Sequence, residues 1–211
     1  MTGGGANDAF SLLARSLRAC RVCADAPLYP PPLPHEPNPL VQGSATARLC
    51  VAAQAPGLQA DRKSKTFADP SGIRLRRWLG LSDAEFYDAS RVAVIPMGSC
   101  FPGFDARDAD LPPRRECAEL WRNRLFSALP DLRLILVIGQ YAQHWHMPQQ
   151  RGWSLTERVR NGLNSLNAPG TPSVALPHPS WRNNRWLKDN PWFEADLLPV
   201  LRVRIREIVT E

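Results

Sequence analysis

The chain of 211 residues contains five cysteines, and four of them have a spacing that suits a metal site. Cys20 and Cys23 form a CxxC pair, and Cys100 and Cys117 follow much later with sixteen residues between them. Four thiolates are enough for a tetrahedral zinc ion or an iron–sulfur cluster. Cys50 lies in an apolar run, where a small thiol packs as a hydrophobic residue. The sequence therefore predicts four metal ligands and one core cysteine.

The charge of the chain favours a polyanionic partner. Twenty-six Lys and Arg residues against twenty Asp and Glu give a formal net charge of +6, which bears on association and not on fold. There is no charged start followed by an apolar segment, and no apolar run long enough for a membrane span. We expect a cytosolic protein without membrane contact, in which clustered cysteines hold metal and do not form disulfides.

The length predicts one compact domain over residues 1–211. A helix lies within residues 1–19, capped by Asn7 or Asp8, and delivers the chain to the CxxC pair. Residues 26–46 form a proline-rich connector, because proline lacks the N–H donor that helices and central strands need.

Short apolar runs alternate with helical patterns in the rest of the chain. Strands are predicted at residues 48–54, 91–95, 132–138 and 173–176, and helices at 71–79, 114–129, from 140 and at 193–209. This alternation predicts an α/β fold, a three-layer α/β/α sandwich around a central, mainly parallel four-stranded sheet. Three strands end in unusual loops, which would share the edge where open α/β sheets bind ligands.

Several motifs lie in these loops. Ala53-Gln54-Ala55-Pro56-Gly57 follows the first strand, with Asp61 and Phe67 after it and Gly72 opening the next helix; Cys100 ends the second motif, and His178-Pro179-Ser180 follows the fourth strand. From Cys20 to about Leu201, the chain resembles the uracil-DNA glycosylase superfamily, most closely its iron–sulfur-containing (family 4-like) bacterial and archaeal branch. The segment after His178, SWRNNRW, is similar to the His-Pro-Ser-x-Arg-Asn loop of single-strand-selective glycosylases.

This resemblance implies an enzyme of base-excision repair that flips a nucleotide out of the duplex into a pocket. Phe67 would stack on the flipped base, and His178 would donate a hydrogen bond from a neutral ring to the base oxygen that gains charge. The implied pocket residues are Gln54, Ala55, Pro56, Gly57 and Phe67. The catalytic candidates are His178, Gln54 and Asp61.

Three positions depart from the pattern of the resembled family. Ala55 stands where its most efficient members place a water-positioning aspartate, and Gln54 stands where the closest branch has glutamate. An amide cannot accept a proton as a carboxylate can, so Asp61 is the nearest candidate base, and we expect either slow chemistry or a base that the motifs do not identify. Pro96 replaces an asparagine that reads the base edge, which favours a base range broader than uracil.

The segment after His178 is expected to contact DNA at the lesion, with stacking groups that fill the gap and polar groups that hold phosphates. The candidates are Ser180, Trp181, Arg182, Asn183 and Arg185, of which Trp181 and Arg182 would be the wedge. The expected partner is DNA with uracil or another deaminated base, single- or double-stranded, bound by a monomer in the bacterial cytosol or nucleoid.

The resemblance favours a 4Fe-4S cluster on Cys20, Cys23, Cys100 and Cys117, with zinc as the alternative, and a structural role for it. The absence of lysine from the motif positions implies a monofunctional hydrolase, a uracil-DNA glycosylase. The alternative is that the protein is catalytically weak and binds lesions or abasic sites. The residues at positions 54 and 55, which are not carboxylates, are the reason for this alternative.

Overall fold

A computed structural model describes residues 8–210 of the chain. Its sheet contains β1 (Leu49–Ala53), β2 (Val92–Pro96), β3 (Leu134–Ile138) and β4 (Ser173–Leu176), in the spatial order β2-β1-β3-β4 with every pairing parallel. The predicted four-stranded sheet is confirmed, with ends that differ by a residue or two. Its strands are continuously apolar, as expected of strands covered on both faces.

Helices fill the connections between the strands. The α-helices are α1 (Ala9–Arg18), α2 (Val22–Asp25), α3 (Leu58–Arg62), α4 (Pro70–Leu79), α5 (Asp83–Phe86), α6 (Arg115–Cys117), α7 (Asn123–Ser127), α8 (Gln140–His146), α9 (Leu155–Arg160), α10 (Gly162–Leu166), α11 (Asn184–Asp189) and α12 (Leu198–Thr210). Two segments are π-helical, η1 (Ala118–Arg122) and η4 (Phe193–Leu197), and two are short 3₁₀ turns, η2 (Pro148–Gln150) and η3 (Trp181–Asn183). Asp8 caps α1 by accepting a hydrogen bond from the backbone of Ser11, while the alternative cap, Asn7, lies outside the described residues.

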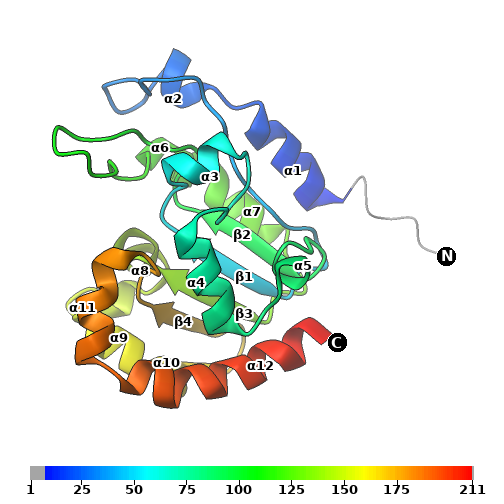
Figure 1. Cartoon of the computed structure of the whole chain (residues 1–211). Coiled ribbons are helices and arrows are strands. Elements are labelled where there is room, and N and C mark those ends of the chain that lie inside the picture. The colour runs from blue at the N-terminus through cyan, green and yellow to red at the C-terminus, as the bar shows by residue number, and fades with distance from the viewer. Residues whose placement is uncertain (1–7, 211) are drawn as a thin grey trace.

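The sheet separates two apolar clusters. Leu49 and Val51 of β1 pack in the larger cluster, with residues of α4 and α12. Cys50, which lies between them in sequence, faces the opposite side and packs with residues of α1 and α7. Figure 1 shows the resulting arrangement, with α4 and α12 on one side of the strands and α1 and α7 on the other. The three-layer sandwich is therefore confirmed, and Cys50 is fully buried as expected.

One predicted helix, residues 114–129, is interrupted by the π-helical turn η1. The turn ends at Arg122, whose buried guanidinium donates to the Ile95 carbonyl at 3.1 Å and from Nε to His146 Nε2 at 3.0 Å. Burial, together with the Arg122 charge, lowers the pKa of His146 to about 3. His146 is therefore a neutral packing residue, and this buried polar pair accounts for a helix more irregular than its apolar period predicts.

The strand order places a topological switch point between β1 and β3. From β1 the chain crosses to β2 on one side, and later to β3 on the other. Loops leave such a point in opposite directions and open a crevice outside the carboxyl ends of the strands. The segments that begin with Gln54 and Gly139 flank this crevice, since they directly follow β1 and β3.

Replacement of Phe10 tests whether α1 belongs to the same folding unit as the sheet. Phe10 is fully buried beneath α1, so Phe10→Ala should lower the free energy of unfolding in urea by about 3–5 kcal/mol. The control Leu12→Ala, in the same helix but half exposed, should cost far less. Equal and small effects would show that α1 does not contribute to the core.

Candidate active site

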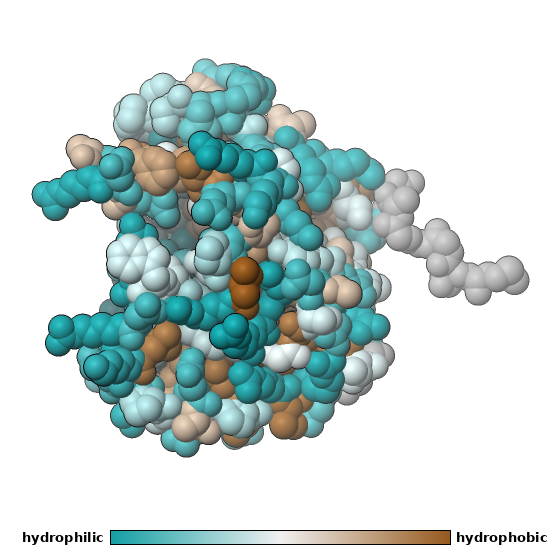
Figure 2. All heavy atoms as spheres, viewed as in Figure 1, coloured by the Kyte–Doolittle hydropathy of each residue, from teal (hydrophilic) through white to brown (hydrophobic). Residues whose placement is uncertain are grey.

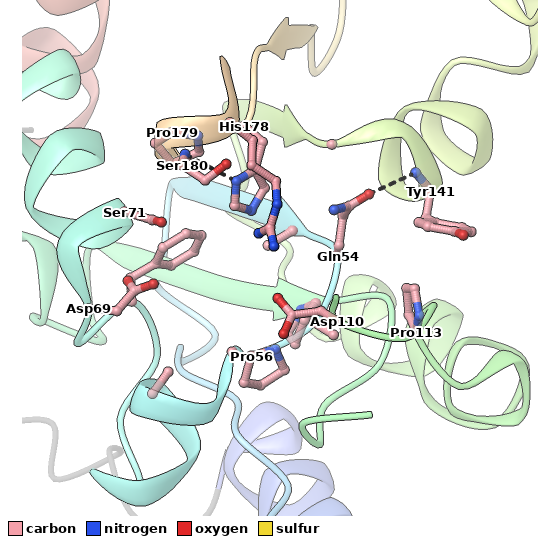
Figure 3. A pocket seen from close by; sticks show the side chains of 18 of the residues that line it. Gln54, Pro56, Asp69, Ser71, Asp110, Pro113, Tyr141, His178, Pro179 and Ser180 are labelled. Carbon is pink, nitrogen blue, oxygen red and sulfur yellow. Dashed lines mark hydrogen bonds between the residues drawn. The ribbon is translucent and has the colours of Figure 1, made fainter. Parts of the chain in front are cut away.

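A cavity of about 1020 Å³ opens at the carboxyl edge of the sheet. Its walls come from the loop after each of the four strands and from the segment that leads into α4. Figure 2 shows the molecule hollowed on one side, with hydrophilic and hydrophobic residues both on the rim, and Figure 3 shows the side chains that project into the cavity. The volume is ample for a nucleotide, because ligand sites for small molecules span about 300–1,000 Å³.

Gln54 occupies the switch point itself. Its side-chain oxygen lies 3.5 Å from the backbone N–H of Tyr141, at the start of α8 (Figure 3). A Cβ atom on Gly139 would come within 2.4 Å of the Gln54 side chain, and Gly139 has a φ of +83°. Glycine is therefore required at position 139, where the chain leaves β3 next to the Gln54 amide. The contact holds Gln54 in the cavity wall, where its NH₂ group remains a donor for a ligand.

His178 lies at the end of β4, one residue after Pro177, and lines the cavity. The backbone N–H of Ser180 donates to its Nδ1 at 3.2 Å, so the proton of a neutral ring is on Nε2. Burial lowers the pKa of His178, the Asp69 charge raises it, and Arg182 lowers it. Asn183 fixes the turn by donating to the His178 carbonyl at 2.8 Å. The ring is therefore a neutral donor at neutral pH.

Phe67 lies in the cavity wall in a conformation that its surroundings hold. Its φ is +52°, in the left-handed region that non-glycine residues rarely adopt. Its carbonyl accepts hydrogen bonds from Arg76 and from the Tyr87 hydroxyl, both at 3.1 Å, and its ring meets Phe86 edge to face at 6.1 Å. A Cβ atom on Gly72 would lie 1.7 Å from that carbonyl. Four neighbours thus hold Phe67 in this conformation.

The candidate base Asp61 does not line the cavity. Helix α3 turns it away, its backbone carbonyl accepts from Asn38 of the connector, and its Oδ1 is buried without a hydrogen-bond partner among residues 8–210. The expectation of a catalytic Asp61 gains no support from this position. Two other carboxylates, Asp69 and Asp110, line the cavity instead.

The predicted DNA-contacting segment forms the rim of the cavity. Arg74 of α4 anchors it by donating to the Ser180 carbonyl at 3.2 Å and to Asn184 at 2.8 Å. Trp181 is 71% exposed, and the Arg182 guanidinium lies 5.3 Å from the centre of its ring. The four residues from Ser180 to Asn183 line the cavity. Arg185 does not, and its exposed side chain pairs with Asp189.

A comparison with family models gives one match that covers most of the chain. The Uracil DNA glycosylase superfamily matches residues 40–202, which is well over half of the 211 residues. The chain belongs to this superfamily. The matched span includes β1 to β4 and each loop that forms the cavity.

Two solved structures are similar at low identity. A candidate uracil DNA glycosylase from Methanosarcina acetivorans is 16% identical, with 79% of this chain and 95% of that chain covered and a TM-score of 0.48. The SMUG2 protein of Pedobacter heparinus is 10% identical, with 75% and 76% covered and a TM-score of 0.41. Similarities at this level carry no argument about the site. The predicted iron–sulfur branch and the single-strand-selective loop stay predictions.

Within this uracil DNA glycosylase superfamily member, the predicted thiol ligands lie near one another. Cys23 and Cys100 share a small apolar cluster with Leu33 of the connector. Burial raises the pKa of Cys23 to about 12, and the charges of Cys117 and Cys20 raise it as well. Burial likewise raises the pKa of Cys100 to about 12, with contributions from Cys117, Cys23 and Cys20. Cys20 and Cys117 are thus close enough to act on Cys23 and Cys100.

The thiols do not form a ligand sphere. Within residues 8–210, no group of three or more His, Cys, Asp or Glu side chains has an arrangement that could hold a metal ion. Cys117 instead accepts a hydrogen bond from the Ser99 backbone at 3.3 Å. In chemical type the four thiols suit such a site, since thiolates bind both zinc and iron–sulfur clusters.

Asp69, Arg74, Asp110 and Tyr141 line the cavity of this superfamily member, and sequence reasoning identified none of them as site residues. Asp69 also caps α4, because it accepts from the Gly72 backbone at 2.9 Å. An Asp-Pro helix start at residue 69 was a local signal for that cap. Asp110 had only its place in the loop after β2, and Tyr141 only its place at the start of α8, shortly after β3.

The region described includes no helix that is long and apolar enough to cross a membrane.

Replacement of Gly72 tests how Phe67 is held. Gly72→Ala places a methyl group against the Phe67 carbonyl, so the backbone must shift, and we expect a loss of about 1–3 kcal/mol in the free energy of unfolding. The control Gly152→Ala meets no atom within 4 Å and should be nearly neutral. Equal stability of both variants would contradict the described contact.

Proposed function

We propose that the protein hydrolyses the N-glycosidic bond of deoxyuridine in DNA after base flipping, as a monofunctional glycosylase. The observation that carries the proposal is the tautomer of His178, whose Nδ1 accepts from the Ser180 backbone and leaves Nε2–H free to donate. Phe67 lines the same cavity. A stacking ring and a neutral donor are what a flipped pyrimidine with a carbonyl oxygen requires.

Bond breakage leaves positive charge on the sugar and negative charge on the base. A donor aimed at the base oxygen stabilises this charge separation more than it stabilises the intact nucleotide, and so accelerates the reaction. Burial, the main influence on His178, lowers its pKa, so the ring remains an uncharged donor over the neutral pH range. A neutral imidazole can hold the anionic base without surrendering its own proton.

The base range should be broader than uracil. Pro96 ends β2 within the cavity lining and offers no side-chain hydrogen-bond donor or acceptor for a base edge. Gln54 is held in the wall beside Tyr141, and its amide carries both donors and an acceptor. A site without a side chain dedicated to hydrogen bonding with the base edge discriminates only weakly between bases. Deaminated purines, hypoxanthine and xanthine, are therefore proposed as further substrates.

The rim segment is proposed to stabilise the flipped state in DNA. Trp181 is the most exposed large apolar side chain of those described, and base–aromatic stacking is worth about 1–3 kcal/mol per base. Arg182 beside it can contact phosphate or stack through its guanidinium plane. Because Arg74 ties this segment to α4, the wedge is held in place before DNA binds.

Cys20, Cys23, Cys100 and Cys117 are proposed to hold a 4Fe-4S cluster with a structural role. These residues join α2 and the loop after β2 to α6, and Arg114 already links α6 to the connector by donating to the Pro31 carbonyl at 2.7 Å. A bound cluster would add covalent cross-links between segments that share few apolar contacts.

His178→Ala tests the proposed chemistry. On oligonucleotides with one uracil, multiple-turnover formation of alkali-labile sites should fall about 10²–10³-fold, because the oxygen that gains charge loses its donor. The matched control is His144→Ala, on the exposed side of α8 and outside the cavity lining, and it should retain full activity.

A different outcome would favour the second function. Ala55 and Gln54 supply no carboxylate at the end of β1. This observation favours the second candidate function, a protein that binds lesions or abasic sites. If the unaltered protein binds uracil-containing DNA tightly and selectively but shows no turnover, it is a lesion-binding protein and not an enzyme.

Metal content tests the cysteine site. The purified protein should be brown and carry about four iron atoms per chain, and Cys23→Ser should lose both colour and iron. Cys50→Ser alters a fully buried core thiol and should keep its iron. A colourless protein with stoichiometric zinc would contradict the cluster and establish the zinc alternative.

A further inference from the structure

The proposed hydrolysis needs a group that accepts a proton from the attacking water, and the motif after β1 does not supply one. The side chain of Ala55 is a methyl group and that of Gln54 is an amide. An amide accepts hydrogen bonds but does not accept a proton. Asp61 lies outside the cavity lining. Of the residues described, Asp69 and Asp110 are the carboxylates that line the cavity.

The two carboxylates differ in how they are bound. Asp69 caps α4, with one oxygen engaged by the Gly72 backbone at 2.9 Å. The Asp110 carboxylate has no hydrogen bond or ion pair with any residue of the described range, 8–210. Figure 3 shows Asp110 projecting into the space between Pro56, Gln54 and His178. Asp110 is therefore free to bind a water molecule through both oxygens.

A compact turn presents Asp110 to the cavity. The Asp105 side chain accepts from the backbones of Arg107 and Ala109, at 2.8 and 3.0 Å, and a bridge pairs Phe104 with Asp110. The position of Asp110 is thus fixed by the backbone of its loop, without use of its own carboxylate. This is the arrangement that a catalytic side chain needs, since its donors and acceptors must stay available.

Two charged groups of other elements act on Asp110. Burial raises the pKa of Asp110, Arg182 lowers it, and Asp69 raises it. Asp69 and Arg182 also act on His178. The net shift is upward, because burial is the largest influence, and a raised pKa makes the carboxylate a better proton acceptor than a free aspartate.

We propose that Asp110 is the general base of the hydrolysis, an inference that rests on the proposed function. Water attacks the C1′ carbon of the sugar, and its proton passes to the Asp110 carboxylate. The C1′–N bond breaks, and its electron pair goes to the base, whose anionic oxygen accepts the hydrogen bond from His178 Nε2. The base then takes up one proton, which restores Asp110 directly or through solvent. The products are free base and an abasic sugar.

Asp110→Asn tests this role in the full-length protein, measured on single-uracil oligonucleotides. We expect kcat to fall about 10²–10⁴-fold, while the dissociation constant for an uncleavable 2′-fluoro-deoxyuridine oligonucleotide stays within threefold. The acid limb of the kcat/KM profile, which the unaltered protein should show as Asp110 becomes protonated, should also disappear. Asp110→Glu should restore part of the rate.

The matched control is Asp108→Asn, in the same turn but outside the cavity lining, where asparagine suits the φ of +56°. It should retain full activity. Near-normal kcat in Asp110→Asn, or loss of oligonucleotide binding together with kcat, would overturn the role as base. Loss of activity in Asp69→Asn but not in Asp110→Asn would assign the base to Asp69. If the unaltered protein releases no base, the proposed function fails and the inference fails with it.

Discussion

The contact between the Gln54 side chain and the backbone at Gly139 lies at the centre of the structure. Adjacent parallel strands β1 and β3 bring these residues together at their carboxyl ends, and no Cβ atom fits at position 139. Because the chain leaves this point in opposite directions, the loops cannot close over the strand ends. The cavity, and the placement of His178 on the next strand, β4, follow from this constraint.

Around that crevice, the site is held by groups that take no part in the proposed chemistry. Gly72, Arg76 and Tyr87 fix the backbone of Phe67 in a rarely adopted conformation. Backbone conformations of this kind cost about 1–3 kcal/mol and persist where the surroundings enforce them. Ser180 and Asn183 do the same for His178. A stacking ring and a donor held before binding lower the cost of ordering them around a base.

Much of this arrangement could be predicted from sequence, because strand and loop alternate so clearly. The parallel sheet follows from apolar runs that end in recognisable loops. Phe67 and His178 were predicted with the help of the family resemblance, and both line the cavity, while their roles stay predictions. Asp61 could not be placed in this way, because one turn of α3 decides whether a side chain faces the cavity or the connector. Asp110 depends on how a long loop folds back over the sheet. The hydrogen-bond partners of Arg122 come from two other elements, β2 and α8. Such long-range contacts leave no local pattern.

The most direct test of the account is a crystal structure of the protein with an oligonucleotide that carries 2′-fluoro-deoxyuridine, a nucleotide whose sugar resists the build-up of positive charge. The account predicts an extruded base in the cavity, stacked on Phe67, with a carbonyl oxygen within hydrogen-bond distance of His178 Nε2. A base that stays in the DNA stack, or lies in the cavity without contact to either residue, would contradict the central claim that this cavity receives the flipped base.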